Sequence, residues 1–593
     1  MDHDIATSYQ ELNLTPKDEG HILRSTTDRF ITILYATETG NAEEVAERIA
    51  RLAYRRHIRV NLKNMEFYDK TDLVNETLVI FVVSTTGNGE FPAPARPFWQ
   101  FLLRSNLPND ILSELDFTVF GLGDSNYPRF CWAARMLQKR LQQLGGNNWL
   151  EEGEADDQHY LGIDGALDPW LDSLKAKLDI VMPIPSGMEK IDDEALLPPR
   201  VYTQTTGAMP KDFTDPTKIH AKIIRNLRIT SEDHWQDVRL LEMELDESIA
   251  KPAYRAGDIA CLMPTNSEES VETLMSRLGW SESADLQIQL ENTDHFRPLP
   301  EPLASENQQG SLTLRRLLTR YLDPFSVPRR SFFETIAHFS PPDHREHEKL
   351  QEFLRPGEGT DDMYEYAQRV RRTMAEVLYE FTSVSIPIKY VMDVFPMLRE
   401  RQYSIASSPS LYGRTIQLLI ALVSYKTRLQ KPRQGVGSAW IASLTPSTRI
   451  PLRLISGSML LPAQPTVPIL AIGPGTGIAP IRSIVQERIA TDPSAIDNTL
   501  VLGCRYSHRD FLLKAEWEML ADKSTSAGDD AEIDEQLASA VQSLAMRKPL
   551  IKLFVAASRD QSEKVYVQDV LRSQAALVWN ILGTQRGIAY LSG

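Results

Sequence analysis

The stretch FITILYATETGNAEEVAERIARLAY, residues Phe30–Tyr54, sets the fold class of the N-terminal part of this chain. It begins with apolar, β-forming residues up to Ala36 and continues through a polar turn. It ends in a helical pattern in which Val45, Ile49 and Leu52 share one face. A buried strand that runs through a short turn into an amphipathic helix is the repeating unit of a parallel, doubly wound α/β sheet.

The same alternation of strand and helix continues along the chain. Leu78–Ser84 and Phe117–Gly121 are apolar runs of the kind that lie buried in parallel sheets. We therefore expect a doubly wound domain over residues 30–178, preceded by a polar N-terminal extension over residues 1–29. Residues 179–218 lose this periodicity and contain repeated prolines, which predicts a linker.

Two further domains are expected after the linker. Alternating strands predict an antiparallel barrel over residues 219–460, with a helical insert at about residues 268–391. The barrel strands are expected at Ile219–Ile229, Asp237–Glu244, Gln402–Ala406, Thr415–Tyr425 and Ile450–Ile455. Strand and helix alternate again over residues 461–593, with strands at Val467–Ile472, Thr499–Cys504, Leu550–Ala556 and Ile588–Ser592. The predicted fold class is a multidomain α/β protein in which two α/β domains flank a barrel.

Composition excludes several classes of protein. A chain of 593 residues, 42% of them hydrophobic and 24% charged, is too long for a single core. Its net charge of −16 argues against a nucleic-acid-binding protein. The 3 cysteines, Cys131, Cys261 and Cys504, lie too far apart in sequence for a disulfide framework or a thiolate metal site, so we expect no metal.

No segment is suited to a signal peptide or a membrane span. Residues 1–29 are polar, and the longest apolar candidate, from Leu452 to Ile472, is interrupted by prolines. We expect a protein of a reducing compartment, the cytoplasm, and leave an association with mitochondria open.

Three loops of the first domain, each at the end of an expected strand, are suited to bind a phosphate and a planar ring. The turn at Thr37–Ala42 opens a helix, so its N–H groups, the helix dipole and two threonine hydroxyls can enclose a phosphate; by itself the turn could equally be a plain helix cap. Two later strand ends add flexible backbone, and Tyr127 adds a stacking face. Ligands of doubly wound sheets bind beyond the carboxyl ends of the strands, so the three loops together predict one site. Its residues are Thr37, Glu38, Thr39, Gly40, Asn41, Ala42, Ser84, Thr85, Thr86, Gly87, Asn88, Gly89, Leu122, Gly123, Asp124, Ser125, Asn126 and Tyr127.

This module resembles a flavodoxin-type FMN domain, because Gly121–Phe130 (GLGDSNYPRF) is similar to the ring-binding loop of that family. The resemblance implies FMN as the cofactor. It points to Asp156 and Asp157, which lie where related reductases place an acidic group near the isoalloxazine, with a solvated acidic loop as the alternative, and it adds Asp157 to the predicted site. Thr86 stands where P450 reductases place a second aromatic residue, so we expect one ring face to be less covered. An acidic surface at this site would attract a basic partner.

The barrel carries a second pair of segments. Arg401–Ser408 (RQYSIASS) starts a strand with a cation, an aromatic ring and a hydroxyl, which for an ordinary strand needs no functional explanation. It resembles the RxYSxxSS signature of ferredoxin-reductase-like FAD domains, and Gly435–Ser438 is similar to their GVCS pyrophosphate loop, with Gly437 in place of the cysteine. The resemblance implies that Ser404 is a catalytic residue, which reaches flavin N5. The implied FAD residues are Arg401, Gln402, Tyr403, Ser404, Gly435, Val436, Gly437 and Ser438.

The third domain contains a glycine-rich turn, Gly473–Pro480 (GPGTGIAP), between a strand and a helix. That arrangement binds the pyrophosphate of dinucleotides. Cationic, hydroxyl and phenol groups follow at the next strand ends; such groups are often only solvated, but together they suit a 2′-phosphate and favour NADPH over NADH. The predicted NADPH residues are Gly475, Thr476, Gly477, Arg505, Ser558, Arg559, Lys564, Tyr566 and Gln568.

The order of these motifs along nearly the whole chain resembles the diflavin reductase family. Within it, the stretch Leu312–Glu334 (LTLRRLLTRYLDPFSVPRRSFFE) resembles the NADPH-dependent diflavin reductases of cytosolic iron–sulfur protein assembly. That we expect no membrane anchor fits the same branch of the family. The resemblance implies electron transfer from NADPH through FAD and FMN to a one-electron acceptor, an anamorsin-type iron–sulfur protein. The alternative is a soluble reductase whose acceptor is a P450, a sulfite reductase haemoprotein or methionine synthase.

The sequence stops at Gly593, on what resembles the last cofactor-facing strand of the NADPH domain. In the family, the next segment supplies a Gly-x-x-x-Met helix, an acid beside the nicotinamide and a terminal aromatic residue over the FAD ring. Either the sequence given lacks this tail of the protein, or the chain transfers hydride poorly. In the second case, a flavin-binding scaffold or regulatory protein becomes an alternative of another class.

Overall fold

A computed structural model of the chain describes residues 29–213, 219–249, 253–294, 296–429, 432–492, 497–522 and 550–593. The chain divides into two compact units. Unit 1 comprises Met1–Lys211, Leu274–Leu314 and Pro324–Pro396, and unit 2 comprises Asp212–Thr273, Arg315–Asp323 and Met397–Gly593. The expected N-terminal extension lies outside the described residues, except for Arg29.

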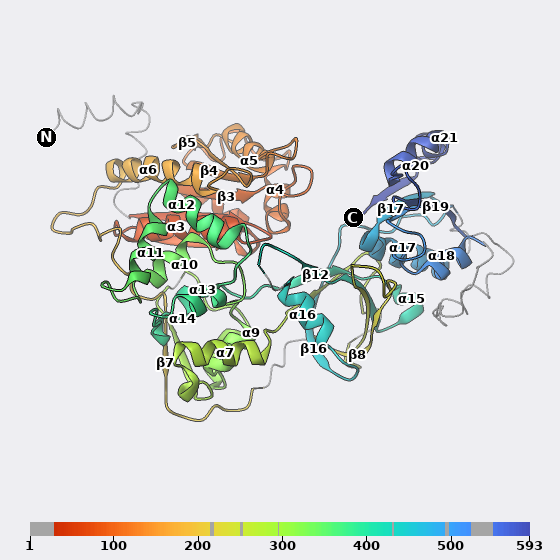
Figure 1. The fold of residues 1–593 in the computed structure, drawn as a ribbon. Helices are drawn as coiled ribbons and strands as arrows, with labels where there is room; N and C mark the ends of the chain where they lie inside the picture. Colours follow the sequence, from red (N-terminus) through yellow and green to blue (C-terminus); the bar gives the residue numbers. More distant parts are fainter. Residues whose placement is uncertain are drawn as a thin grey trace. The chain divides into compact units, whose positions relative to one another are not determined.

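Unit 1 contains a parallel sheet in the order β2-β1-β3-β4-β5, with β6 beside β4 (Figure 1). Its strands are β1 (Phe30–Ala36), β2 (Arg59–Asn64), β3 (Leu78–Ser84), β4 (Asp116–Gly123), β5 (Asn147–Asn148) and β6 (Gly153–Asp156). The inner strands are mostly apolar and almost wholly buried, because helices cover both faces of the sheet. Helices α3 (Asn41–Tyr54) and α6 (Asp164–Val181) pack on one face, and α4 (Arg96–Leu102) and α5 (Trp132–Gln143) pack on the other. The expected doubly wound fold is confirmed.

Most of the insert also belongs to unit 1, and it is largely helical. Its helices are α7 (Glu268–Leu278), α8 (Leu303–Gln309), α9 (Leu314–Arg320), α10 (Arg330–Ala337), α11 (Arg345–Leu354), α12 (Glu358–Met363), the π-helix η5 (Tyr364–Gln368), α13 (Met374–Glu380) and α14 (Val391–Val394). Its strand β11 (Ile288–Asn292) pairs antiparallel with β7 (Val201–Thr205). Strand β7 comes from the segment expected to be a linker, so part of that segment has regular structure.

Buried ion pairs join the insert to the first domain. Arg48 of α3 donates to Asp164 and, at 2.7 Å, to Asp168, and both aspartates belong to α6. Arg330 of α10 reaches Asp168 from the insert, with 3.4 Å between nitrogen and oxygen. The side chains of Arg48 and Arg330 are 9% and 11% exposed, so water competes little for these contacts. One carboxylate therefore bridges two guanidinium groups from different parts of the sequence.

Unit 2 begins with a six-stranded antiparallel sheet in the order β12-β10-β16-β8-β9-β13. Its strands are β8 (Ile219–Arg228), β9 (Val238–Leu245), β10 (Ile259–Leu262), β12 (Arg401–Ser404), β13 (Thr415–Ala421) and β16 (Arg449–Ile455). Ile405, just after β12, forms a β-bridge with Leu418 of β13, so the two edge strands approach each other. The sheet thus closes almost completely into the expected barrel (Figure 1).

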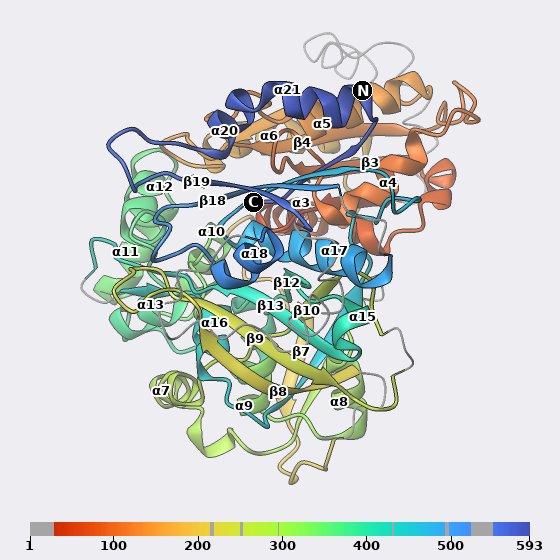
Figure 2. The same ribbon diagram turned by 90° about the vertical axis from the view of Figure 1, so that its right-hand side faces the viewer.

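The C-terminal domain of unit 2 is built on a parallel sheet in the order β19-β18-β17-β20. Its strands are β17 (Ile469–Pro474), β18 (Asn498–Cys504), β19 (Lys552–Ala557) and β20 (Ile588–Leu591). Helices α17 (Ile478–Thr491) and α18 (Lys514–Leu520) cover one face, and α20 (Val567–Ser573) and α21 (Ala575–Trp579) cover the other (Figure 2). The second α/β domain is therefore also confirmed.

A buried guanidinium joins this domain to the barrel. Arg482 of α17, whose side chain is 1% exposed, forms two hydrogen bonds of 2.8 and 2.9 Å with the carboxylate of Glu516. It also donates to the carbonyl of Ala406 at 2.9 Å and to the side chain of Gln417 at 2.7 Å, and both of these residues belong to the barrel. Its charge and most of its donors are thus satisfied inside the protein, as burial of a charged group requires.

We predict that Glu516→Gln lowers the free energy of unfolding of unit 2 by about 3 kcal/mol, because it leaves the Arg482 charge buried without its counter-ion. Chemical denaturation followed by circular dichroism measures the change. Asp246→Asn is the matched control, because it breaks the more exposed pair with Arg449 (2.7 Å) and should cost at most about 1 kcal/mol. Equal effects of the two substitutions would contradict the prediction.

Candidate functional site

The predicted phosphate turn lies between the end of β1 and the start of α3. Thr37 is buried, and its hydroxyl oxygen accepts a hydrogen bond of 2.8 Å from the N–H of Gly40. Glu38 and Thr39 are exposed, whereas Asn41 and Ala42 form the first turn of the helix. The helix has fourteen residues, and no side chain caps its first N–H groups, which leaves them for an anion.

The two predicted ring loops leave the same edge of the sheet. Strands β1, β3 and β4 are neighbours and run parallel, so the loops that follow them converge. Thr86 and Glu90 close a tight turn with two hydrogen bonds of 2.9 and 2.8 Å, and Gly87, Asn88 and Gly89 form its tip. The predicted residues Ser84 to Gly89 thus lie beside the phosphate turn, as expected.

The loop after β4, which contains Gly123 to Tyr127, presents an open aromatic ring. Tyr127 is 58% exposed, so its ring face is available for stacking. The backbone N–H of Ser125 donates to the Asp156 carboxylate at 2.9 Å, which holds the loop in place. Asp156 therefore has a structural role in the turn.

Asp157 lies next to this loop, and its own N–H donates to the carbonyl of Gly123 at 2.9 Å. Burial raises the pKa of its carboxyl group, and the negative charges of Asp124 and Asp156 act in the same direction, against the opposing charge of Arg371. An acidic group of raised pKa therefore lies beside the predicted ring loops, which fits the position expected for it.

The barrel brings the two predicted FAD segments together. Arg401, Gln402, Tyr403 and Ser404 form strand β12, which pairs with β10. Gly435 caps helix α16 (Val436–Ser443), and Val436, Gly437 and Ser438 form its first turn. A Cβ atom added to Gly437 would lie 3.3 Å from the Arg401 side chain and 3.8 Å from the Tyr403 hydroxyl. A cation, a phenol ring and a helix N-terminus thus meet at one place, and this set fits a flavin dinucleotide.

Three side-chain environments refine this second site. Ser438 accepts a hydrogen bond of 2.8 Å from the N–H of Val423, which fixes the loop to the barrel. Burial raises the pKa of the Tyr403 hydroxyl, so this side chain stays a neutral hydrogen-bond donor. Ser404 is half-buried at the end of β12, opposite Ile259 of β10.

The predicted pyrophosphate turn, Gly475–Gly477, lies between β17 and α17. The absence of a side chain is required at Gly477, because an added Cβ would lie 2.2 Å from the carbonyl oxygen of Ser592. Only a residue without a side chain therefore allows the backbone after β20 to approach this turn. Thr476 lies in the same single helical turn.

Neighbouring strand ends bring the predicted 2′-phosphate residues together. Strands β18 and β19 pair in parallel. At their ends, the N–H of Ser558 donates to the carbonyl oxygen of Cys504 at 3.0 Å, and the N–H of Arg559 donates to the carbonyl oxygen of Arg505 at 2.8 Å. Ser558 is buried and Arg559 is exposed. Lys564, Tyr566 and Gln568 follow at the start of α20, also exposed.

One side chain near this group was not singled out by the sequence. Trp235, from the hairpin between β8 and β9, lies over the guanidinium of Arg505 at 4.6 Å from its ring centroid. It is 62% exposed, although a tryptophan usually buries its large apolar surface. The hairpin is fixed to the third domain by a hydrogen bond of 2.9 Å from the N–H of Ser231 to the carbonyl of Arg509. No motif or spacing marked Trp235, because its neighbour lies far away in sequence.

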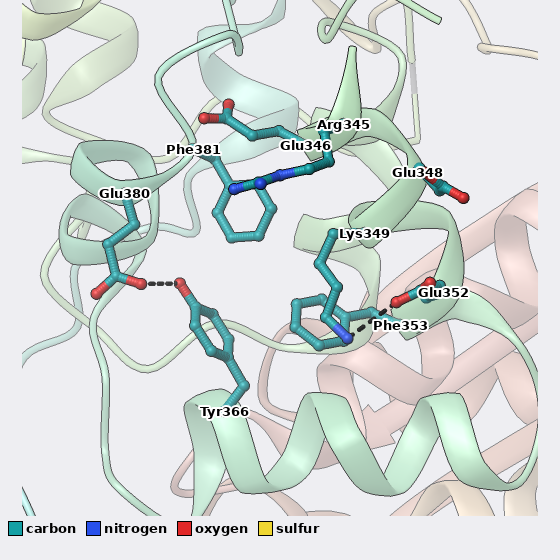
Figure 3. A pocket seen from close by; sticks show the side chains of 9 residues that line it. All are labelled: Arg345, Glu346, Glu348, Lys349, Glu352, Phe353, Tyr366, Glu380 and Phe381. Carbon is teal, nitrogen blue, oxygen red and sulfur yellow. Dashed lines mark hydrogen bonds and ion pairs between the residues drawn. The ribbon is translucent and has the colours of Figure 1, made fainter. Parts of the chain in front are cut away.

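A separate groove of about 440 Å³ lies in the insert (Figure 3). It is lined by residues of α11, η5 and α13, and none of the predicted cofactor residues is among them. Lys349 donates to Glu352 at 3.0 Å and Tyr366 donates to Glu380 at 2.7 Å, so these polar groups satisfy one another. The groove therefore adds no cofactor site.

The described part of the chain was also compared with the requirements of a membrane-spanning helix and of a metal site. Within it, no helix is long and apolar enough to cross a membrane. No group of three or more histidine, cysteine, aspartate or glutamate side chains within it could hold a metal ion.

Comparison with known families supports a three-domain organisation. Residues 33–170 match the flavodoxin family, residues 211–440 match the FAD binding domain, and residues 471–593 match the oxidoreductase NAD-binding domain. These matches follow the order of the three groups of loops described above.

Comparison with curated proteins gives relatives along the whole chain. Proteins named NADPH-dependent diflavin oxidoreductase 1 from Xenopus laevis and Danio rerio are 38% and 39% identical to it. The protein of that name from Schizosaccharomyces pombe is 36% identical. Each alignment covers 95% of this chain and 91% of the relative. The chain therefore belongs to the family of NADPH-dependent diflavin oxidoreductases, flavoprotein enzymes that use FMN, FAD and NADPH.

Proposed function

We propose that this oxidoreductase delivers electrons from NADPH, one at a time, to the iron–sulfur cluster of an anamorsin-type protein in cytosolic iron–sulfur protein assembly. The bound flavins supply the conversion of a two-electron hydride donor into a one-electron donor. The observation that carries the proposal is the family membership, over 95% of the chain, combined with the resemblance of Leu312–Glu334 to the iron–sulfur branch of the family.

Charge and backbone geometry support the proposed NADPH end of the site. A backbone hydrogen bond joins Arg559 to Arg505, so two cationic residues leave neighbouring strand ends, where the 2′-phosphate would bind. Ser558, Lys564, Tyr566 and Gln568 add donors around them. The turn at Gly475–Gly477 would hold the pyrophosphate with backbone N–H groups.

The two flavin sites are proposed on the same grounds. Arg401 and Gly435–Ser438 would bind the FAD pyrophosphate, and Tyr403 would stack on the ring, with Ser404 as the side chain that reaches flavin N5. Thr37–Ala42 would bind the FMN phosphate, and Tyr127 would cover one face of the FMN ring. The open ring of Tyr127 and the nearby carboxylates of Asp124 and Asp157 make this edge suitable for docking a basic acceptor surface.

We predict that Arg559→Ala raises the KM for NADPH about tenfold or more and leaves the KM for NADH nearly unchanged, because only NADPH carries the 2′-phosphate. Steady-state reduction of a one-electron dye measures both constants. Arg572→Ala is the matched control, since this exposed arginine of α20 pairs with Asp569 at 2.8 Å. Equal losses with both nucleotides would reject the phosphate assignment.

We predict that Trp235→Leu weakens binding of 2′,5′-ADP two- to fivefold, because the contact of an exposed ring with a guanidinium is worth about 0.5–1 kcal/mol. Isothermal titration calorimetry measures the change. Trp579→Leu is the control, since that tryptophan is 72% exposed on α21. If Trp235→Leu leaves the affinity for 2′,5′-ADP unchanged, the contact of the Trp235 ring with Arg505 does not contribute to nucleotide binding and the prediction is wrong.

The proposed acceptor is tested by anaerobic stopped-flow spectroscopy. With NADPH present, we expect the enzyme to reduce an anamorsin-type iron–sulfur protein at least tenfold faster than a P450, a sulfite reductase haemoprotein or methionine synthase. The rate should fall with added salt if the carboxylates near Tyr127 attract the acceptor. Faster reduction of one of the other acceptors would replace the proposed partner and leave the diflavin enzyme intact.

A further inference from the structure

The segment Pro328–Glu334 (PRRSFFE) of the insert lies against the first domain within unit 1. Its Arg330 belongs to the buried ion pairs with α6 described above. Its neighbour Arg329 points to the predicted FMN phosphate turn instead. Nη2 of Arg329 donates to the carbonyl oxygen of Thr39 at 3.1 Å and to Oδ1 of Asn41 at 3.2 Å.

These contacts matter because the turn contains no cation of its own. Between Ala36 and Ala42 the only charged residue is Glu38, which would repel a phosphate. A phosphate needs donors around it, whereas the Thr39 carbonyl and Asn41 Oδ1 are acceptors. Arg329 donates to both acceptors, so these oxygens point toward its guanidinium group and not toward the phosphate. Its guanidinium also places a positive charge next to the turn. The backbone N–H groups at the start of α3 then remain for the anion.

Arg329 is held in this position by its surroundings. The neighbouring Arg330 side chain donates to the carbonyl of Leu354 at 2.8 Å and to the hydroxyl of Thr360 at 3.0 Å. The carbonyl of Pro328 accepts a hydrogen bond from the side chain of Gln368. Three other parts of unit 1 thus fix the backbone on both sides of Arg329, so little backbone entropy is lost when its side chain binds the turn.

We infer that Arg329 is a positioning residue for the FMN phosphate: the insert, and not the flavodoxin domain alone, completes that half of the FMN site. The inference rests on the proposed assignment of Thr37–Ala42 to the phosphate. By linkage, docking of the insert on the turn and binding of FMN strengthen each other. Discrimination between FMN and riboflavin, which lacks the phosphate, then depends on a residue of the insert.

The test uses the full-length protein depleted of FMN, and it measures the quenching of flavin fluorescence as FMN or riboflavin is added back. We expect Arg329→Gln to raise the Kd for FMN about tenfold or more, the scale of a lost charge-assisted contact, and to change the Kd for riboflavin less than twofold. Arg329→Lys, which keeps the charge but not the fork of donors, should give an intermediate Kd for FMN.

Two further variants separate the possible failures. Arg345→Gln changes another arginine of the insert, in the groove of Figure 3, and should leave both Kd values unchanged. Thr37→Val removes the hydroxyl that bonds Gly40 and tests the turn itself. If Thr37→Val weakens FMN binding but Arg329→Gln does not, or if Arg329→Gln weakens FMN and riboflavin equally, the role of Arg329 is rejected. If neither variant affects FMN, the assignment of the turn is rejected as well.

Discussion

A carboxylate shared by two largely buried arginines is the interaction on which the architecture of unit 1 depends. Asp168 of α6 contacts Arg48 of α3 and Arg330 of α10, and Asp164 completes the neutralisation of Arg48. Burial alone would lower the pKa of Arg48, but the charges of Asp164, Glu334 and Asp168 raise it, so it stays cationic. Removing one member of such a group leaves an unpaired charge at a cost of about 3–5 kcal/mol. This network ties the insert to the helix whose N-terminus faces the phosphate site.

For function, this network places a residue of the insert, Arg329, against the proposed FMN phosphate turn of the first domain. Arg330 and Arg329 are adjacent in sequence, and they serve different contacts: one holds the insert on α6, and the other grips the turn before α3. A shift of the insert would therefore move Arg329 away from the turn. Unit 2 uses the same physical device, since Arg482 joins the barrel to the nucleotide domain through Glu516 and Gln417. In each unit, a buried guanidinium thus joins two segments that carry proposed cofactor loops.

Sequence reasoning located the strand ends and the loops that follow them well, because their positions follow from local patterns. The strand that ends at Ala36, the turn that follows and the helix up to Tyr54 were all visible in one stretch, and in the structure β1 and α3 end at these two residues. The end of β13 was less well predicted, because Thr415–Ala421 stops before the expected Tyr425, which lies in the short strand β14 (Ser424–Tyr425). The linker prediction missed β7, since its partner β11 comes from the insert, which the local pattern cannot indicate.

The sequence by itself determined the order of the three domains, their fold classes and the loops at the strand ends, because hydrophobic periodicity and glycine-rich turns are local properties. Only the tertiary structure decided which distant side chains support those loops. Arg329 and Thr39 are 290 residues apart, and Trp235 and Arg505 come from different domains of unit 2. Such pairs form only when packing brings their elements together. The local sequence around an arginine or a tryptophan does not indicate which distant residue it will contact.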